Sequence, residues 1–242
     1  KRQEIQLPNV SYYSMLDNHT GYIKLDEFTK DAGKNVLEAY KKLKAEGADK
    51  LVLDLRGNGG GLLNEAVNIV NIFVDKGQTV VSKKAKNVEK SVTFKTTQKA
   101  FDANVPLVVL IDAYSASASE IVAGSLQDLD RAVVVGQRSF GKGLVQTVIP
   151  LIYNTQMKVT ESKYYIPSGR CIQAIDYANR DENGRATKIP DSLKTAFKTK
   201  NGRTVYAGSG IEPDVYIEPV YASNIAISLI GKSICFNYAT EF

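Results

Sequence analysis

The sequence predicts an α/β fold in which a mixed, twisted β-sheet built from βαβ units carries its helices outside and is joined by an additional antiparallel β region. The first observation is that short apolar runs alternate with stretches of helical spacing, which is typical of parallel βαβ units. The second is that three predicted strands end in runs rich in glycine or serine. The third is a later pair of β-rich runs joined by a short turn, which predicts an antiparallel hairpin.

Each element is predicted from its own periodicity. Helices are indicated by apolar residues three and four apart, and strands by continuous or alternating apolar runs. Gly47 supplies a helix stop after residue 46. In chain order the predicted elements are strand 21–28, helix 31–46, strand 50–55, helix 62–73, short strands 78–82 and 91–95, strand 105–111, helix 119–129, strand 132–135, strands 144–151 and 157–165, and a helix that begins over 225–234.

The rest of the chain predicts less regular structure. Lys1 to Val10 contains Pro8 and suggests a linker or edge strand that arrives from something upstream. Residues 166–210 are rich in proline, glycine, asparagine and charge, so we expect only short strands there. We therefore divide the chain into a linker or strand over 1–20, a core over 21–219 and the start of a C-terminal helical region over 220–242.

Composition excludes several classes of function. The 242 residues carry a formal net charge of +5, and 43% of them are hydrophobic, so the chain can bury a sizeable core. The lysines between residues 83 and 95 are spread along a predicted hairpin, so we expect a solvated face and no nucleic-acid partner. No run is apolar for long enough to cross a bilayer. One histidine and two cysteines, without metal-ligand spacing, predict no metal site.

Three predicted strand ends carry the candidate functional residues. The glycine run 57–61 lets backbone N–H groups approach a ligand, either a phosphate or an oxyanion. It is not a dinucleotide fingerprint, because Leu62 stands where the last glycine is needed. The serine run 115–119 lies where a strand stops and a helix begins. A serine there is either a helix N-cap or a nucleophile beside unpaired N–H groups.

The third strand end, residues 136–143, matches a phosphate-binding loop only in part. It follows a strand and fits G-x-x-x-x-G-K, but Gly143 stands where a serine or threonine would hold magnesium. The residues after it are β-rich, so no helix N-terminus is expected to face the loop. Nucleotide binding at Gly136 to Lys142 is therefore a distant third among the functions considered.

Lys142 has a second interpretation as a general base. Flanked by glycines and Phe140, its side chain can be drawn under apolar cover, where desolvation disfavours the ammonium ion. A neutral amine beside a serine hydroxyl can accept its proton. His19 is the alternative base, but it lies in the turn 17–20, far from all three loops in chain order. We do not expect His19 to catalyse a reaction.

Several ordered motifs together resemble the carboxyl-terminal processing peptidases, also called tail-specific proteases, of serine peptidase family S41. The resemblance runs from about Ile5 to Glu218. It rests on the stretches Leu53–Gly60, Ser115–Ile121, Phe140–Gln146, Tyr164–Arg170 and Gly210–Asp214. It implies a ClpP/crotonase-like fold and a serine endopeptidase that cleaves protein substrates near their C-termini with a serine–lysine dyad, without a metal or organic cofactor.

The resemblance also implies a role for each site residue. The nucleophile falls on Ser117 and the general base on Lys142, with Gln146 matching the glutamine that orients the lysine. The oxyanion donors are implied to be the N–H of Ala118 and one from the glycine run. The candidates in that run are Gly60 and Gly61. Glu120 and Ser139 match positions near the site, where support or capping is favoured over chemistry.

The resemblance further implies partners and a compartment. Family members usually carry a PDZ domain in the same chain, which captures substrate C-termini, so we expect a protein or peptide partner with an accessible C-terminus. Membrane contact is expected only through substrates or a missing N-terminal segment, and the location is expected to be extracytoplasmic, in the periplasm or cell envelope. The alternative function is a non-catalytic ligand-binding module on the same fold, as in retinoid-binding relatives. Such modules should lack the serine or the lysine, whereas this chain keeps both.

Overall fold

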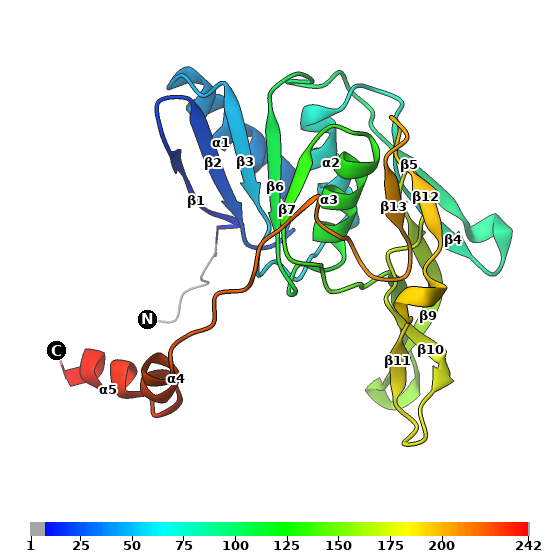
Figure 1. Cartoon of the computed structure of the whole chain (residues 1–242). Coiled ribbons are helices and arrows are strands. Elements are labelled where there is room, and N and C mark those ends of the chain that lie inside the picture. Colours follow the sequence, from blue (N-terminus) through cyan, green and yellow to red (C-terminus); the bar gives the residue numbers. More distant parts are fainter. Residues whose placement is uncertain (1–7, 242) are drawn as a thin grey trace.

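The computed structural model describes residues 8–241 and has a six-stranded sheet at its centre (Figure 1). Its strands, in spatial order, are β1 (Val10–Met15), β2 (Thr20–Leu25), β3 (Lys50–Asp54), β6 (Leu107–Ile111), β7 (Val133–Gly136) and β14 (Val215–Tyr216). Only the β1–β2 pair is antiparallel, and the other four pairs are parallel. The mixed α/β sheet that the sequence predicts is confirmed.

Three helices cover one face of this sheet (Figure 1). They are α1 (Ala32–Ala45), α2 (Leu63–Phe73) and α3 (Ala118–Asp128). α1 turns Val36, Tyr40 and Leu43 into the core at helical spacing. It ends where predicted, because Gly47 has a φ of 106°, a left-handed conformation that glycine adopts without steric cost after a helix. All residues of α3 are buried, so packing on all sides fixes the position of its N-terminus after β6.

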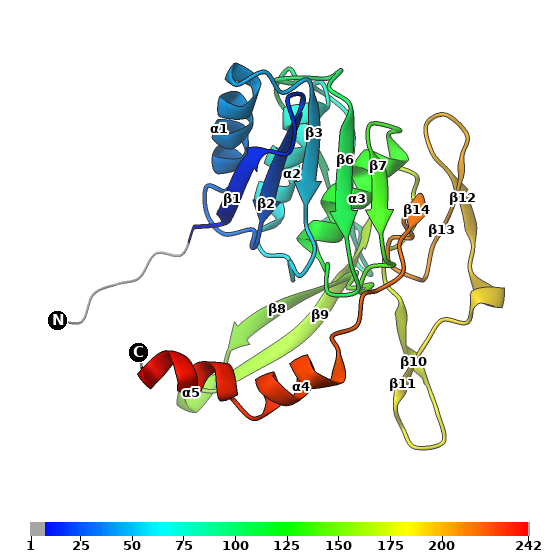
Figure 2. The same cartoon turned by 60° about the vertical axis from the view of Figure 1, so that its left-hand side comes forward.

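A second sheet is wholly antiparallel and has the order β5-β4-β9-β8. Its strands are β4 (Thr79–Ala85), β5 (Val92–Lys95), β8 (Leu144–Pro150) and β9 (Gln156–Tyr165). The β8–β9 hairpin that the sequence predicts projects away from the main sheet (Figure 2). The strands of residues 166–210 form two small hairpins, β10 (Ile175–Arg180) with β11 (Ala186–Lys188) and β12 (Ala196–Lys198) with β13 (Thr204–Tyr206). Short 3-10 helices span Val88–Lys90, Ile152–Asn154 and Asp191–Leu193.

The two ends of the chain carry an edge strand and two short helices. Residues 1–7 of the expected linker lie outside the described residues, and β1 joins the main sheet directly after them. The helix expected to begin over residues 225–234 is present as α4 (Asn224–Gly231), and a second short helix, α5 (Ile234–Glu241), follows it. The break falls beside Ser233, whose φ of 53° is incompatible with a continuous α-helix. No helix within residues 8–241 has the length and apolar character of a membrane span.

A buried ion pair joins the segment after β9 to the end of α3. The guanidinium of Arg170 lies 2.9 Å from the carboxylate of Asp128, and both side chains are at most 1% exposed. Gln127 accepts a further hydrogen bond from Arg170 at 2.7 Å, and the N–H of Ser168 donates to Asp128 at 2.9 Å. Burial raises the pKa of Asp128, while the neighbouring Arg170 acts in the opposite direction. The pair therefore links the segment after β9 to the end of α3, and each buried charge depends on the other as its partner.

Replacing Arg170 by methionine should lower the free energy of unfolding by ~3–5 kcal/mol, because it leaves the Asp128 carboxylate buried without its partner. Urea denaturation followed by circular dichroism measures this change. Lys34→Met is the matched control, since its partner Glu38 lies 3.9 Å away on an exposed helix face. Its effect should stay within ~0.5 kcal/mol. A similar small loss in both variants would contradict the structural role of the buried pair.

Candidate active site

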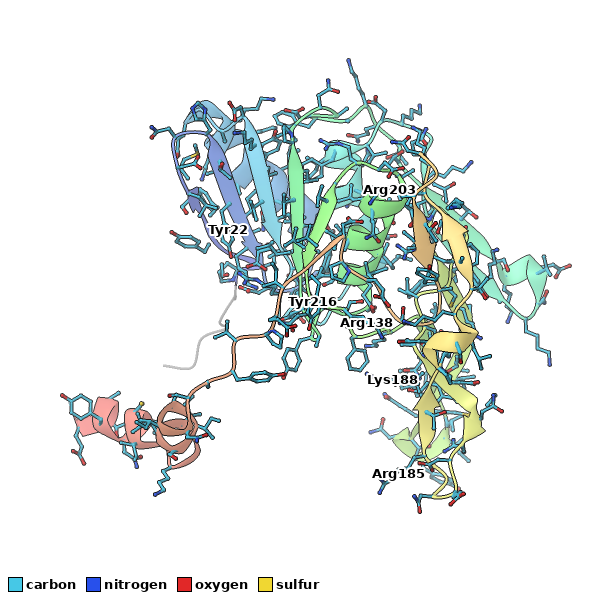
Figure 3. The ribbon with its side chains drawn as sticks, in the orientation of Figure 1. Tyr22, Arg138, Arg185, Lys188, Arg203 and Tyr216 are labelled. Carbon is cyan, nitrogen blue, oxygen red and sulfur yellow. The ribbon has the colours of Figure 1, made fainter. Side chains whose placement is uncertain are left out.

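The three loops that the sequence singles out lie together at the carboxyl ends of β3, β6 and β7. The N–H of Ala116 donates to the carbonyl of Asn58 at 3.0 Å, which joins the serine run to the glycine run. The N–H of Phe140 donates to the carbonyl of Ser115 at 3.0 Å, which adds the third loop. Arg138, on this third loop, marks that end of the sheet in Figure 3. The expected convergence of the three strand ends is therefore present.

His19 lies at the other end of the sheet. It precedes β2, which is parallel to β3, so it sits near the amino ends of these strands. Its ring contacts the carboxylate of Asp49 at 3.1 Å, and both side chains are exposed. A histidine placed there does not reach the three loops.

Ser117 occupies the N-cap position of α3 with an unusual backbone conformation. Its φ of 57° and ψ of −111° are outside the regions that non-glycine residues normally adopt. Such strain persists only where the surroundings impose it, and it is frequent at functional sites. The next residue, Ala118, is 1% exposed, and its N–H has no acceptor within residues 8–241. A half-buried hydroxyl thus stands beside an unpaired N–H of the first helical turn.

The glycine run packs directly against this turn. Gly60 has a φ of 103°, and a Cβ on it would lie 2.7 Å from the carbonyl oxygen of Ala116 and 2.8 Å from the Cβ of Ser117. Only glycine fits this approach. The N–H of Gly60 is already engaged, because it donates to the side-chain oxygen of Asn58 at 2.9 Å.

Gly61 has the opposite arrangement. It forms a parallel bridge with Phe28, in which Phe28 donates to the carbonyl of Gly60 at 3.0 Å and accepts from Leu62 at 2.7 Å. In such a bridge the flanking peptide groups make the hydrogen bonds, so the N–H of Gly61 points away from Phe28. That N–H has no acceptor among the described residues. Of the two glycines predicted as oxyanion donors, Gly61 is the one whose N–H is unpaired in the described part of the chain.

Glu120 connects the serine turn to the lysine loop. Its carboxylate is fully buried and accepts from the N–H groups of Ser117 at 2.8 Å, Lys142 at 2.8 Å and Gly141 at 2.7 Å. The hydroxyl of Ser139 also donates to it at 2.5 Å. Burial raises the pKa of Glu120, and the hydrogen bonds act in the opposite direction. The supporting role expected for Glu120 and Ser139 therefore has a definite form: they join the two loops through one carboxylate.

Lys142 is held by its backbone while its side chain is exposed. The apolar cover suggested by the sequence is absent, because Phe140 is itself 49% exposed. The loop is instead clamped from the other side, where the N–H of Gly143 donates to Gln173 at 2.8 Å and the N–H of Ala174 donates to the carbonyl of Gly141 at 3.0 Å. β8 follows the loop directly, so this loop does not lead into a helix as a phosphate-binding loop does, and the phosphate-loop interpretation gains no support.

Gln146 lies on β8 with an exposed side chain, whose amide nitrogen is 3.5 Å from the hydroxyl of Thr160. Within residues 8–241 it makes no hydrogen bond with Lys142. Gln173 and Asn58, which the sequence analysis did not select, are the amides that hold the loops. Asn58 could have been selected from the sequence, because it lies within the glycine run. Gln173 could not, because it lies 30 residues from the glycine it binds.

Comparison with known proteins places this geometry in a family. Residues 19–179 match the model of "Peptidase family S41". This chain belongs to peptidase family S41. The carboxy-terminal-processing protease of Bartonella bacilliformis is 40% identical over 178 residues, which are 72% of this chain and 40% of that protein. A probable CtpA-like serine protease of Staphylococcus aureus is 39% identical over 173 residues, which are 71% of this chain and 34% of that protein.

Solved structures agree with the family assignment. The photosystem II D1 C-terminal processing protease has a TM-score of 0.68 and 28% identity, and the match covers 90% of this chain and 50% of that one. An S41 protease from Bacteroides fragilis matches with a TM-score of 0.64 and 15% identity over 98% of this chain and 60% of that one, a likeness that shows the fold alone. The S41 fold is ClpP/crotonase-like, as expected. The chain spans less than half the length of the two curated relatives described above.

Replacing Glu120 by glutamine should lower the free energy of unfolding by ~1.5–3 kcal/mol. The change keeps the shape but turns one acceptor oxygen into a donor, so a buried N–H loses a hydrogen bond to a charged group. Chemical denaturation measures the loss. Glu65→Gln is the matched control, since Glu65 accepts a backbone N–H from Gly33 at 2.8 Å outside the site. Equal losses in the two variants would argue against a special role for Glu120.

Proposed function

We propose that this chain is the proteolytic core of a serine endopeptidase that uses Ser117 and Lys142 as a catalytic dyad. The observation that carries the proposal is the Glu120 carboxylate, which accepts the backbone N–H of both residues at 2.8 Å. Membership of family S41 supports it from an independent direction. A ligand-binding module would not need a serine and a lysine to be held by the same buried group.

The proposed reaction begins with acyl transfer to Ser117. The neutral amine of Lys142 accepts the hydroxyl proton as the Ser117 oxygen bonds to the scissile carbonyl carbon. The tetrahedral intermediate collapses, the C–N bond breaks, and the ammonium of Lys142 returns the proton to the leaving amine. Water then attacks the acyl-enzyme ester with Lys142 again as base, which releases the carboxylic acid and restores the serine.

The N–H groups of Ala118 and Gly61 are proposed to stabilise the oxyanion. Both are free of acceptors within the described residues, whereas the N–H of Gly60 is bound by Asn58. Donors fixed before the reaction stabilise the developing negative charge without reorganisation in the transition state. Ala118 contributes a donor from the helix N-terminus, where the helix dipole also favours negative charge.

The exposed Lys142 is proposed to complete the site when a substrate covers it. Within residues 8–241 its backbone N–H is hydrogen-bonded to Glu120, and its side chain is proposed to turn toward Ser117 when substrate binds. The assignment of Gln146 as the residue that orients Lys142 rests on family resemblance, and in the structure its nearest partner is Thr160.

The proposed substrates are proteins cut near an accessible C-terminus. This specificity is carried by the relatives' names, a carboxy-terminal-processing protease and a D1 C-terminal processing protease. Because the chain spans only part of those proteins, the substrate class and any PDZ domain in the same chain belong to the proposal.

Ser117→Ala and Lys142→Ala should each reduce cleavage of fluorescently labelled casein to the background rate, because each removes one half of the dyad. Lys163→Ala is the matched control: Lys163 is an exposed lysine on the neighbouring strand β9, and its loss should leave cleavage within about twofold of the parent. A fluorophosphonate should label Ser117 alone, as located by mass spectrometry. Unchanged cleavage by either dyad variant would refute the proposal, and binding of casein without cleavage by the parent would favour the non-catalytic module.

A further inference from the structure

We infer that Asn58 is a positioning residue that sets the geometry of the oxyanion hole. The inference rests on the function proposed above, since it assigns Asn58 a role in that reaction. Asn58 is fully buried and lies in the glycine run rather than in the serine turn or the lysine loop. It acts through the N–H groups of other residues and does not itself touch the reacting atoms.

The side chain of Asn58 fixes the glycine run in two directions. Its amide oxygen accepts the N–H of Gly60 at 2.9 Å, two residues along the chain, which is the pattern of an Asx-turn. Its amide nitrogen donates to the carbonyl of Leu25 at the end of β2 at 2.9 Å. The turn is thereby anchored to the sheet. With the peptide of Gly60 held in this way, the N–H of Gly61 is left to face outward.

The backbone carbonyl of Asn58 holds the nucleophile turn on both sides of Ser117. It accepts the N–H of Ala116 at 3.0 Å and the hydroxyl of Ser119 at 2.9 Å. These two residues directly flank the Ser117–Ala118 pair that supplies the nucleophile and one oxyanion donor. A single residue therefore binds the glycine run through its side chain and the serine turn through its backbone.

This double attachment matters because the two proposed donors come from different loops. An oxyanion hole works only when both N–H groups lie about 3 Å from one oxygen position. A misplacement of about 1 Å can cost roughly a hundredfold in rate. The contact is already tight, since a Cβ on Gly60 would lie 2.8 Å from the Cβ of Ser117. Loss of the Asn58 amide frees the glycine run to move relative to Ser117 while the backbone hydrogen bonds to the serine turn remain.

The test compares Asn58→Ala with Asn58→Ser and a control. Alanine removes the side-chain acceptor and donor, whereas a serine hydroxyl can form the weaker equivalent of the same turn with the N–H of Gly60. Asn71→Ala is the control. Asn71 bridges α2 to a neighbouring loop by accepting from Thr97 at 3.0 Å and Gln98 at 2.9 Å, far from the site in the fold. The Asn71→Ala variant measures how stability and kcat change when an asparagine that bridges two segments outside the site is lost.

Each variant is assayed by the rate of Ser117 labelling with a fluorophosphonate and by kcat and KM for p-nitrophenyl butyrate. Asn58→Ala should lower the labelling rate and kcat at least about tenfold with KM within about twofold, since the donors act in the transition state. Asn58→Ser should recover part of the loss, and Asn71→Ala should leave kcat unchanged. Thermal unfolding and hydrogen exchange at the Gly60 amide, expected to be faster in Asn58→Ala, show whether the loop has moved in a folded protein.

The outcomes separate this inference from the proposed function. If the parent protein is labelled at Ser117 and Asn58→Ala is labelled equally fast, the role of Asn58 is refuted and the dyad stands. If Asn58→Ala and Asn71→Ala lose kcat in proportion to their loss of stability, the role of Asn58 is only structural and the inference is likewise overturned. If the parent is not labelled at Ser117, the proposed function fails and the inference fails with it. Should Asn58→Ala not fold, Asn58→Ser decides between the same outcomes.

Discussion

The site depends on one fully buried carboxylate, that of Glu120. Burying a carboxylate is costly unless its lone pairs are satisfied, and here three backbone N–H groups and the hydroxyl of Ser139 satisfy them. Two of those N–H groups belong to Ser117 and Lys142. The need to pair a buried charge therefore fixes two segments, 25 residues apart in the sequence, against each other. Ser139 extends the linkage by accepting the N–H of Ile211 at 2.7 Å.

Much of the fold could be predicted because its signals are local. The strands β3, β6 and β7 are continuous apolar runs, and α1 shows its buried face at helical spacing before the stop at Gly47. The edge of the sheet that carries the site also followed from the sequence, since parallel strands bring their carboxyl ends together. The identity of the candidate residues came from motifs in these loops, whose order along the chain resembles that of a known family.

What could not be predicted depends on contacts between distant segments. Whether Lys142 is covered depends on where Phe140 points, and Phe140 is 49% exposed. The hydrogen bond between the N–H of Gly143 and the side chain of Gln173 joins residues 30 positions apart. No local sequence pattern predicts it. Likewise, the sequence left Gly60 and Gly61 equivalent as donors. The difference between them comes from two partners, Asn58 within the same run and Phe28 from the segment after β2.

The hydrogen-bond partners of the neighbouring N–H groups support the proposed oxyanion donor at Ala118. A buried backbone N–H normally has a partner, and here Ala116 donates to Asn58, Ser117 to Glu120, and Gly141 and Lys142 to Glu120 as well. The N–H of Ala118, like that of Gly61, differs from these four, because Ala118 is 1% exposed and yet its N–H, in the first turn of α3, has no acceptor in the described chain. The donors on both sides of this position are satisfied, which supports the proposal that the N–H of Ala118 binds a ligand. In the proposed reaction that ligand is the negative oxygen of the acyl-transfer intermediate at Ser117.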